Sequence, residues 1–312
     1  MCNAGPLDKL AQVPTATTNS GGVGTRNLLK RARSKYYTNR IVGHLLYRNS
    51  PIHKQYQRAY YCNTHIVQNG KTFTSKYCNS RACHICNRIR TAKFINGYKQ
   101  PLLDLGALEF TTLTIPNVRH QVLRDTVTRM CKDFTNIIRV LRERRGIKVS
   151  GIRKIEITYN STTDTYHPHL HVITDQSTGE TIIAEWLARY PDATRSAQDT
   201  RKCDENSFNE LFKYTTKIAA KAKSGKGFDV HIPALDMILI ALDKKRTFQS
   251  FGTIKKVSED IEELQAVVVE EAQHAYTEWA YNETTNDWHN IYIPCARLTR
   301  YKPPELELII YH

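Results

Sequence analysis

The sequence is short of acidic residues and contains no long apolar run. Its 312 residues include 30 Asp and Glu against 45 Lys and Arg, a formal charge of +15. This balance favours a polyanionic partner, either nucleic acid or an anionic membrane surface. The longest purely apolar run, residues 237–242, is far below the roughly 18–20 residues of a membrane span, and the first ten residues lack the apolar segment of a secretory signal. We therefore expect a soluble cytoplasmic protein that does not span a membrane.

Length and composition predict one large domain with appendages, or two domains. Residues 1–25 are rich in Thr, Gly, Ala and Asn and are predicted to be a mobile tail. A basic and aromatic segment, 26–60, precedes a cysteine-rich element, 61–100. The main core is expected over 101–230. Residues 231–312 read as a C-terminal α/β region, in which no motif indicates a role.

The segment 26–60 mixes basic side chains with tyrosines. Such a mixture suits a strand of phosphates with stackable bases, but a solvated helix whose tyrosines pack on the protein body would look the same. Further basic residues flank the cysteines. The residues predicted to contact DNA are Arg31, Arg33, Lys35, Arg88 and Arg90.

Four cysteines lie within 25 residues, at Cys62, Cys78, Cys83 and Cys86. The last two form a Cys-x-x-Cys step, the spacing that lets two thiolates bind one tetrahedral Zn²⁺. In a reducing compartment these cysteines indicate a metal site rather than disulfides. We predict a structural zinc, because four sulfurs leave no position for water. Buried or redox-active thiols are the alternative, and His65 or His84 are alternative ligands to Cys62.

The core region has alternating strand and helix patterns, which predict an α+β fold with an antiparallel sheet and helices on one face. Apolar and β-branched runs predict strands, including two joined by a short polar link as a hairpin. Apolar residues at a spacing of three to four predict helices, the first capped by Gly146. The expected strands are 105–115, 151–159, 169–174 and 197–203, and the expected helices are 119–144, 180–190 and 207–223.

The stretch from His167 to Ile173 is the most informative. His169 and His171 project from the same face of a strand because side chains alternate. Glu156 lies in the preceding strand, and hairpin pairing would bring its carboxylate beside the imidazoles. Two histidines and one carboxylate can hold a divalent cation with open positions for a phosphate oxygen. A polar hairpin face without metal is the alternative, and His167, placed before the strand, is a weaker ligand candidate.

The predicted helix 207–223 carries Glu210, Tyr214 and Lys217 on one side, within mutual reach. This set suits covalent phosphoryl transfer, in which the phenol attacks phosphorus, the lysine offsets charge and the carboxylate later activates water. The alternative for Glu210 is structural. Ser207-x-x-Glu210 is a capping-box pattern that would only satisfy backbone N–H groups.

Three motifs occur in order: Phe-Thr-Thr-Leu-Thr at 110–114, His-x-His at 169–171, and Glu-x3-Tyr-x2-Lys at 210–217. Together they resemble the motifs of the HUH-endonuclease replication initiators (Rep) of small bacterial rolling-circle plasmids. The cysteine run 78–86 and Arg-Lys-Ile-Glu-Ile-Thr-Tyr at 153–159 are similar to elements of this family. The glutamate one turn before the tyrosine resembles a branch with a single catalytic tyrosine.

The resemblance implies a site- and strand-specific endonuclease. Tyr214 would become linked to the 5′ phosphate and free a 3′ hydroxyl as primer, while Glu210 would assist hydrolysis at termination. His169 and His171, with Glu156 as the expected third ligand, would hold Mg²⁺ or Mn²⁺. The expected partners are single-stranded or hairpin origin DNA, a host DNA polymerase and a host helicase, because Gly70-Lys71-Thr72 lacks the rest of a phosphate-binding loop. The resemblance also allows a homodimer.

Two alternatives remain open at the sequence level. A transposase or mobilisation relaxase would share the His-x-His strand and the tyrosine helix. A zinc-stabilised nucleic-acid-binding protein without catalysis would share the cysteines and basic flanks, and would be unaffected by loss of the Tyr214 hydroxyl.

Overall fold

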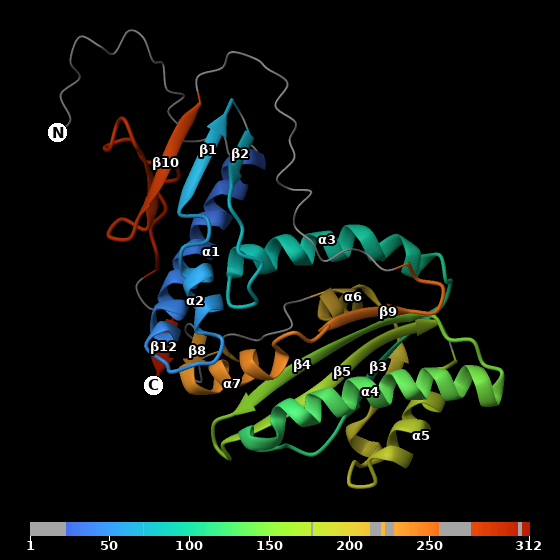
Figure 1. Ribbon diagram of the computed structural model, residues 1–312. Helices are drawn as coiled ribbons and strands as arrows, with labels where there is room; N and C mark the ends of the chain where they lie inside the picture. The colour runs from blue at the N-terminus through green and yellow to red at the C-terminus, as the bar shows by residue number, and fades with distance from the viewer. Residues whose placement is uncertain are drawn as a thin grey trace. The chain divides into compact units, whose positions relative to one another are not determined.

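The computed structural model describes residues 23–70, 72–175, 177–212, 220–221, 228–255, 276–304 and 308–312 (Figure 1). They divide into two compact units. Unit 1 comprises the described parts of residues 1–49, 53–86 and 260–307, and unit 2 the described parts of 50–52, 87–259 and 308–312. Of the predicted tail, only the last three residues lie within the described chain, where helix α1 begins. No helix in the described ranges is both long enough and apolar enough to cross a membrane.

Unit 1 joins segments that are far apart in the sequence. Strand β1 pairs with β10 in a four-stranded antiparallel sheet of order β11-β10-β1-β2. Buried Ile66, Trp279 and Trp288 pack with Ala32 of α1 to form its core. The elements of this unit are α1 (Val23–Leu46), α2 (His53–Tyr60), β1 (His65–Asn69), β2 (Thr72–Ser75), β10 (Thr277–Asn282) and β11 (Asp287–Asn290).

Unit 2 is built on a five-stranded antiparallel sheet of order β6-β3-β5-β4-β9. Its strands are β3 (Leu108–Thr114), β4 (Gly151–Asn160), β5 (Thr165–Asp175), β6 (Asp199–Lys202) and β9 (Phe248–Phe251). β4 and β5 form the predicted hairpin, with Gly151 opposite Thr174 and Asn160 opposite Thr165. This register fixes which side chains of the two strands face each other, and therefore positions the candidate site.

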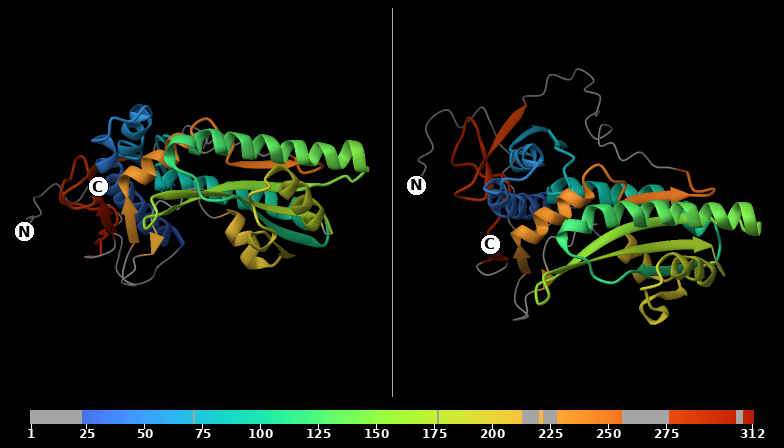
Figure 2. Two further views of the ribbon diagram at one scale, coloured as in Figure 1. Left: turned by 90° about the horizontal axis from the view of Figure 1, so that it is seen from below. Right: turned by 60° about the horizontal axis from the view of Figure 1, so that its bottom comes forward.

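Three helices pack on one face of this sheet (Figure 2): α4 (His120–Arg145), α5 (Gly179–Arg189) and α7 (Ile232–Leu242). α4 is the clearest case, because its buried residues recur every three to four positions, among them Val127, Met130 and Phe134. It ends at Gly146, whose φ of 67° is the left-handed conformation predicted for a C-cap. The buried core of this face also includes Leu170 and Val172 of β5.

Two more helices cover the opposite face: α3 (His84–Leu103) and α6 (Glu205–Phe212). Phe94 of α3 and Leu211 and Phe212 of α6 pack on Phe110 and Ile173 of the sheet. The α+β fold with an antiparallel sheet is therefore confirmed. The expectation of helices on one face is corrected, because both faces of β3 and β5 carry apolar side chains that need cover.

The predicted helix 207–223 also differs from the structure. α6 runs to Phe212, residues 213–219 lie outside the described chain, and Ala220–Lys221 form strand β7. β7 pairs antiparallel with β8 (Phe228–His231), and β12 (Leu308–Tyr311) pairs parallel with β8. Helical periodicity is a local signal and takes no account of a partner strand, which explains the difference. A single 3₁₀ turn, Arg195–Ala197, precedes β6.

Candidate functional site

Three potential metal ligands converge on the sheet face that α6 covers. His169 and His171 alternate with Leu170 and therefore point away from α4, and Glu156 of β4 lies directly opposite His169. One ligand atom from each of Glu156, His169 and His171 can be chosen so that all three lie within 4.8 Å of one another. All three residues are buried. The structure thus brings together the set that the sequence pattern predicted.

Hydrogen bonds orient both imidazoles. Nδ1 of His169 lies 3.1 Å from the carbonyl oxygen of His167, and since a carbonyl only accepts, this nitrogen carries the proton and the lone pair lies on Nε2. Nδ1 of His171 lies 3.3 Å from Oγ1 of Thr112. Nε2 of His171 is buried, has no hydrogen-bond partner among the described residues, and lies 3.7 Å from Oε2 of Glu156. A divalent cation would satisfy this orphaned nitrogen, so the donor set fits a metal.

Electrostatics keep His171 in the form that binds metals. Burial, together with the neighbouring His169, lowers the pKa of His171 to about 3, although the charge of Glu156 opposes the shift. The ring of Phe110, 5.2 Å away between centroids, supplies an apolar wall. His171 is therefore neutral at pH 7, with its lone pair ready for a cation.

His167 belongs to β5, and its predicted position before the strand was wrong. Proline has no N–H to donate to a second neighbouring strand. The strand can continue through Pro168 because β3 pairs with β5 only up to His169, so that β4 is the regular neighbour of Pro168. The His167 and His169 rings stack at 5.1 Å, and burial together with His169 lowers the pKa of His167.

Lys154 is a site residue that the sequence analysis missed. It is fully buried on β4, and its Nζ donates hydrogen bonds to Oε2 of Glu156 at 3.0 Å and to the carbonyl oxygen of Glu210 at 2.9 Å. A buried ammonium is found almost only with such partners. One side chain therefore connects the metal-binding carboxylate to the backbone of α6. The signal was present in the sequence, as a lysine at the i−2 position of Glu156 on the same face of a strand.

The cap of α6 is not the one that the sequence suggested. Asp204 precedes the helix, and its Oδ1 accepts hydrogen bonds from the backbone N–H and the hydroxyl of Ser207, at 2.7 and 2.6 Å. In return, the Ser207 hydroxyl faces the backbone N–H of Asp204 at 3.3 Å. The capping box is thus Asp204 and Ser207. Glu210 lies in the interior of α6, where its charge acts on His171. Its alternative role as a capping residue was wrong.

Tyr214 and Lys217, the predicted nucleophile and charge partner, lie outside the described residues. The helix that leads to them is described as far as Phe212, and α6 lies against β5. Their roles remain predictions from the sequence.

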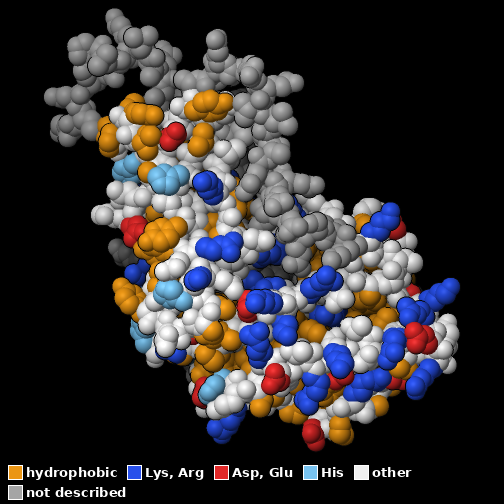
Figure 3. Space-filling model, viewed as in Figure 1, with side chains coloured by type: hydrophobic (Ala, Val, Ile, Leu, Met, Phe, Trp, Pro, Cys, Tyr) orange, Lys and Arg blue, Asp and Glu red, His pale blue; other side chains and the backbone are white. Residues whose placement is uncertain are grey.

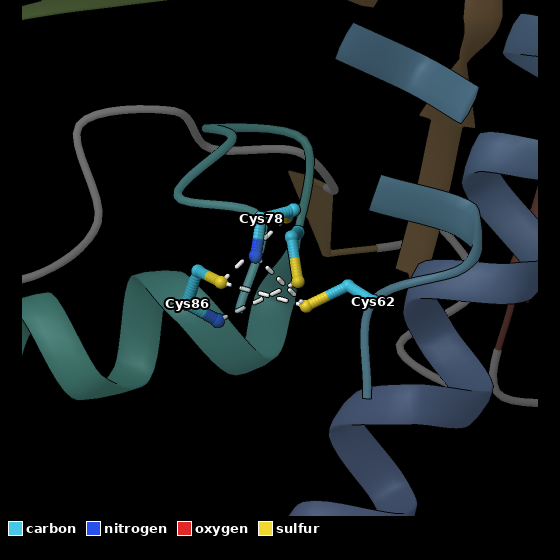
Figure 4. Close-up of side chains that lie close together, drawn as sticks. Cys62, Cys78 and Cys86 are labelled. Carbon is cyan, nitrogen blue, oxygen red and sulfur yellow. Dashed lines mark hydrogen bonds between the residues drawn. The ribbon is translucent and has the colours of Figure 1, made fainter. Parts of the chain in front are cut away.

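Unit 1 holds a second ligand set, the four predicted cysteines, of which Figure 4 shows Cys62, Cys78 and Cys86. Sγ of Cys86 lies 3.6 Å from Sγ of both Cys62 and Cys78. Sulfurs around a tetrahedral zinc with 2.3 Å bonds would be about 3.8 Å apart, so the spacing fits this ion. The group contains four buried cysteines and no histidine. His65 is exposed, and the ring of His84 lies against Tyr37.

The cysteine cluster favours the thiolate form of Cys83 and lies beside the buried ammonium of Lys35. Burial opposes ionisation of Cys83, but hydrogen bonds from Cys62, Cys78 and Cys86 hold the pKa of its thiol well below the usual range. Lys35 donates hydrogen bonds to the carbonyl oxygens of Tyr60 at 2.6 Å and Cys62 at 2.8 Å. Burial lowers the pKa of Lys35 to about 8, although the charge of nearby cysteines opposes the shift. This arrangement resembles a thiolate site more than an inert core of thiols.

The residues predicted to contact DNA differ in their exposure to solvent. Lys35 is fully buried with its ammonium bonded to carbonyl groups, so its prediction as a DNA contact was wrong. Lys35 lies on the buried side of α1, and a count of basic residues does not show which side of a helix each of them occupies. Arg33 is exposed beside Tyr37, and Arg31, Arg88 and Arg90 are half-buried. Of the tyrosines, Tyr56 is fully buried whereas Tyr47 and Tyr61 are largely exposed.

Together, the fold and the two ligand sets define a protein with two candidate metal sites. The site in unit 1 is closed, because four sulfurs would fill every coordination position of a tetrahedral ion. The site in unit 2 is open, because two histidines and a carboxylate would leave coordination positions free. Residues 69–176 match the family model described as Replication protein (Rep_1). This segment is therefore similar to the replication protein family, which confirms the resemblance to a Rep-type protein. It includes three of the four cysteines and all three ligands of the open site, whereas α6 lies beyond it.

Related proteins named Protein rep come from several bacteria. The chain is 29% identical to one from Staphylococcus aureus over 186 residues, which is 50% of this chain and 79% of that protein. It is 24% identical to one from Bacillus amyloliquefaciens over 61% of this chain and 66% of the relative, and 27% identical to one from Streptococcus pneumoniae over 33% and 34%. The match thus spans about a third of the pneumococcal relative's length. No solved structure matches the chain.

Proposed function

We propose that this chain is a rolling-circle replication initiator of a bacterial plasmid, which nicks single-stranded origin DNA through Tyr214. The observation that carries the proposal is the buried set of Glu156, His169 and His171 next to α6. The neutral imidazole of His171, with its orphaned nitrogen, suits a cation, and the helix beside it leads to the tyrosine four residues after Glu210. The names of the relatives favour replication over transposition or mobilisation.

In the proposed reaction, the phenolic oxygen of Tyr214 loses its proton and attacks the scissile phosphorus. The new oxygen–phosphorus bond links the protein to the 5′ phosphate, and the bond to the 3′ oxygen breaks, which gains a proton and leaves as a 3′ hydroxyl. Mg²⁺ or Mn²⁺ bound by Glu156, His169 and His171 would polarise the phosphate, so that a phenol of ordinary pKa can attack. Lys217 would offset charge on the non-bridging oxygens.

At termination, we propose that Glu210 takes a proton from water as the water oxygen attacks phosphorus. The bond between phosphorus and the phenol oxygen breaks, the DNA leaves with a 5′ phosphate, and the phenolate of Tyr214 regains a proton. A single tyrosine then suffices for one cycle. The interior position of Glu210 in α6 supports this role, because Asp204 and Ser207 already satisfy the start of the helix. In the same scheme, zinc held by the four cysteines stabilises unit 1, and a host helicase and polymerase act on the nicked DNA in the bacterial cytoplasm.

The test is formation of a covalent adduct. The protein is incubated with labelled single-stranded origin oligonucleotide and Mn²⁺, and the products are separated on a denaturing gel. We expect a shifted species in the wild type, and loss of at least a hundredfold in Tyr214→Phe, because the phenol oxygen is the attacking atom. Tyr47→Phe, at a largely exposed tyrosine of unit 1, is the matched control and should retain the adduct. An adduct that persists in Tyr214→Phe would assign the nucleophile elsewhere and contradict the proposal.

A further inference from the structure

α4 presents a basic outer surface on the sheet face opposite the candidate metal site. The helix contains seven Lys and Arg against three Asp and Glu. Lys and Arg side chains gather over the part of unit 2 where α4 lies (Figure 3). Four exposed members, spaced so that they lie on one side of the helix, are Arg124, Lys132, Arg139 and Arg142. We name these four residues the α4 stripe.

Interactions within the protein explain only part of the α4 stripe. Arg124 donates a hydrogen bond to the carbonyl oxygen of Ile240 at 3.0 Å, and Arg142 forms an ion pair with Glu143 at 2.8 Å. Basic residues in the last turn of a helix are favoured by its dipole, which accounts for Arg142 alone among the four. Arg124 lies near the opposite end, where a cation is disfavoured and no acidic residue occupies the first turn. Within the described chain, Lys132 and Arg139 form no ion pair. Lys132 and Arg139 are exposed cations without an acidic partner in the described chain, and together with their two neighbours on the same side of the helix they favour an external anion.

We propose that the α4 stripe binds the phosphate backbone of duplex DNA, while single-stranded DNA occupies the opposite face at the metal site. This inference rests on the proposed function. From Arg124 to Arg142 the stripe is about 27 Å long, which is the axial length of roughly eight base pairs of duplex. α4 has no exposed aromatic side chain on which an unpaired base could stack. Contacts to phosphate alone fit a duplex, which presents regularly spaced phosphates without exposing base faces.

Such a surface would hold the double-stranded flank of an origin without reading its sequence. A phosphate contact positions the protein, whereas sequence is read at base edges. The proposed nicking site and the α4 stripe would then lie on different faces of the sheet, so that a substitution in one need not affect the other.

The experiment compares two double variants with equal loss of charge. Lys132→Gln/Arg139→Gln alters the α4 stripe, and Lys99→Gln/Lys244→Gln removes two exposed cations outside it. Binding to a 30-base-pair duplex of arbitrary sequence is measured by fluorescence anisotropy between 50 and 200 mM salt. We expect the stripe variant to bind roughly tenfold more weakly at low salt, with a slope of log K against log salt shallower by about 1.8, because two phosphate contacts are lost. The control should retain wild-type affinity and slope.

A second readout separates this inference from the proposed function. Covalent adduct formation on a short single-stranded oligonucleotide should be equal in the wild type and both variants. If the wild type forms no adduct but duplex affinity still depends on the stripe, the proposed function fails and this inference stands. Equal losses in both variants, no loss in the stripe variant, or no binding of duplex by the wild type would overturn it. A stripe-dependent loss of binding to anionic phosphatidylglycerol vesicles, with duplex binding unchanged, would overturn it in favour of a membrane partner.

Discussion

Lys154 explains how a carboxylate and two imidazoles can lie together in the buried part of unit 2. Removing charges from water is costly, and the ammonium of Lys154 offsets this cost for Glu156 through an ion pair in which both side chains are almost fully buried. The same ammonium bonds to the carbonyl oxygen of Glu210. Before any metal binds, the site is therefore neutralised by a residue of the protein itself.

We expect Lys154→Met to lower the free energy of unfolding by about 3 kcal/mol, because it leaves the carboxylate of Glu156 buried without its cation. Saturating Mn²⁺ should recover much of this loss, since a divalent cation bound to Glu156, His169 and His171 would replace the missing charge. Urea unfolding with and without Mn²⁺ measures both effects.

Lys35→Met is the matched control, because it removes a buried lysine of unit 1 whose ammonium donates hydrogen bonds to the backbone carbonyl oxygens of Tyr60 and Cys62. Mn²⁺ should not recover its stability. Equal recovery in both variants, or in neither, would argue against a cation beside Lys154.

Among the elements, those with a local signal were predictable and those that depend on distant partners were not. The alternation around Leu170 and the periodicity of α4 are properties of a few adjacent residues, so β5 and α4 followed from the sequence, and the hairpin link placed Glu156 beside His169. The pairing of β1 with β10 joins residues more than 200 positions apart and leaves no local trace. The bond from Lys154 to α6 is likewise a property of two elements and not of either alone.

The start of α6 offers a test of the role of Glu210. We expect Asp204→Ala to increase hydrogen exchange of the α6 amides several-fold, because the cap on Ser207 is lost. Glu210→Ala should leave this exchange and the first covalent adduct near wild-type level, but slow hydrolytic release of the DNA at least tenfold. Exchange mass spectrometry and single-turnover adduct kinetics measure the two properties. The same profile in both variants would mean that Glu210 serves the helix rather than hydrolysis.

At the scale of the whole molecule, the two ligand sets belong to different units. The four cysteines lie in unit 1, whereas Glu156, His169 and His171 lie in unit 2. In the proposed scheme, zinc in the closed cysteine site would contribute to folding, and a cation in the histidine site, with its free coordination positions, would serve chemistry. Loss of one metal should thus affect a different part of the chain from loss of the other.

We expect one zinc ion per chain, released by a mercurial reagent and measured with a chromogenic chelator. Its removal should raise hydrogen exchange in residues 26–86 and 276–304 together, because β10 can keep its protection only while β1 is folded. Peptides from β3, β4, β5 and α4 should keep theirs, since their core lies within unit 2. Cys83→Ser should reproduce the effect without the reagent, whereas Cys131→Ser, a half-buried cysteine of α4, should not. A chain that binds no zinc, or one that loses protection equally in both units, would contradict a structural role for zinc that is confined to unit 1.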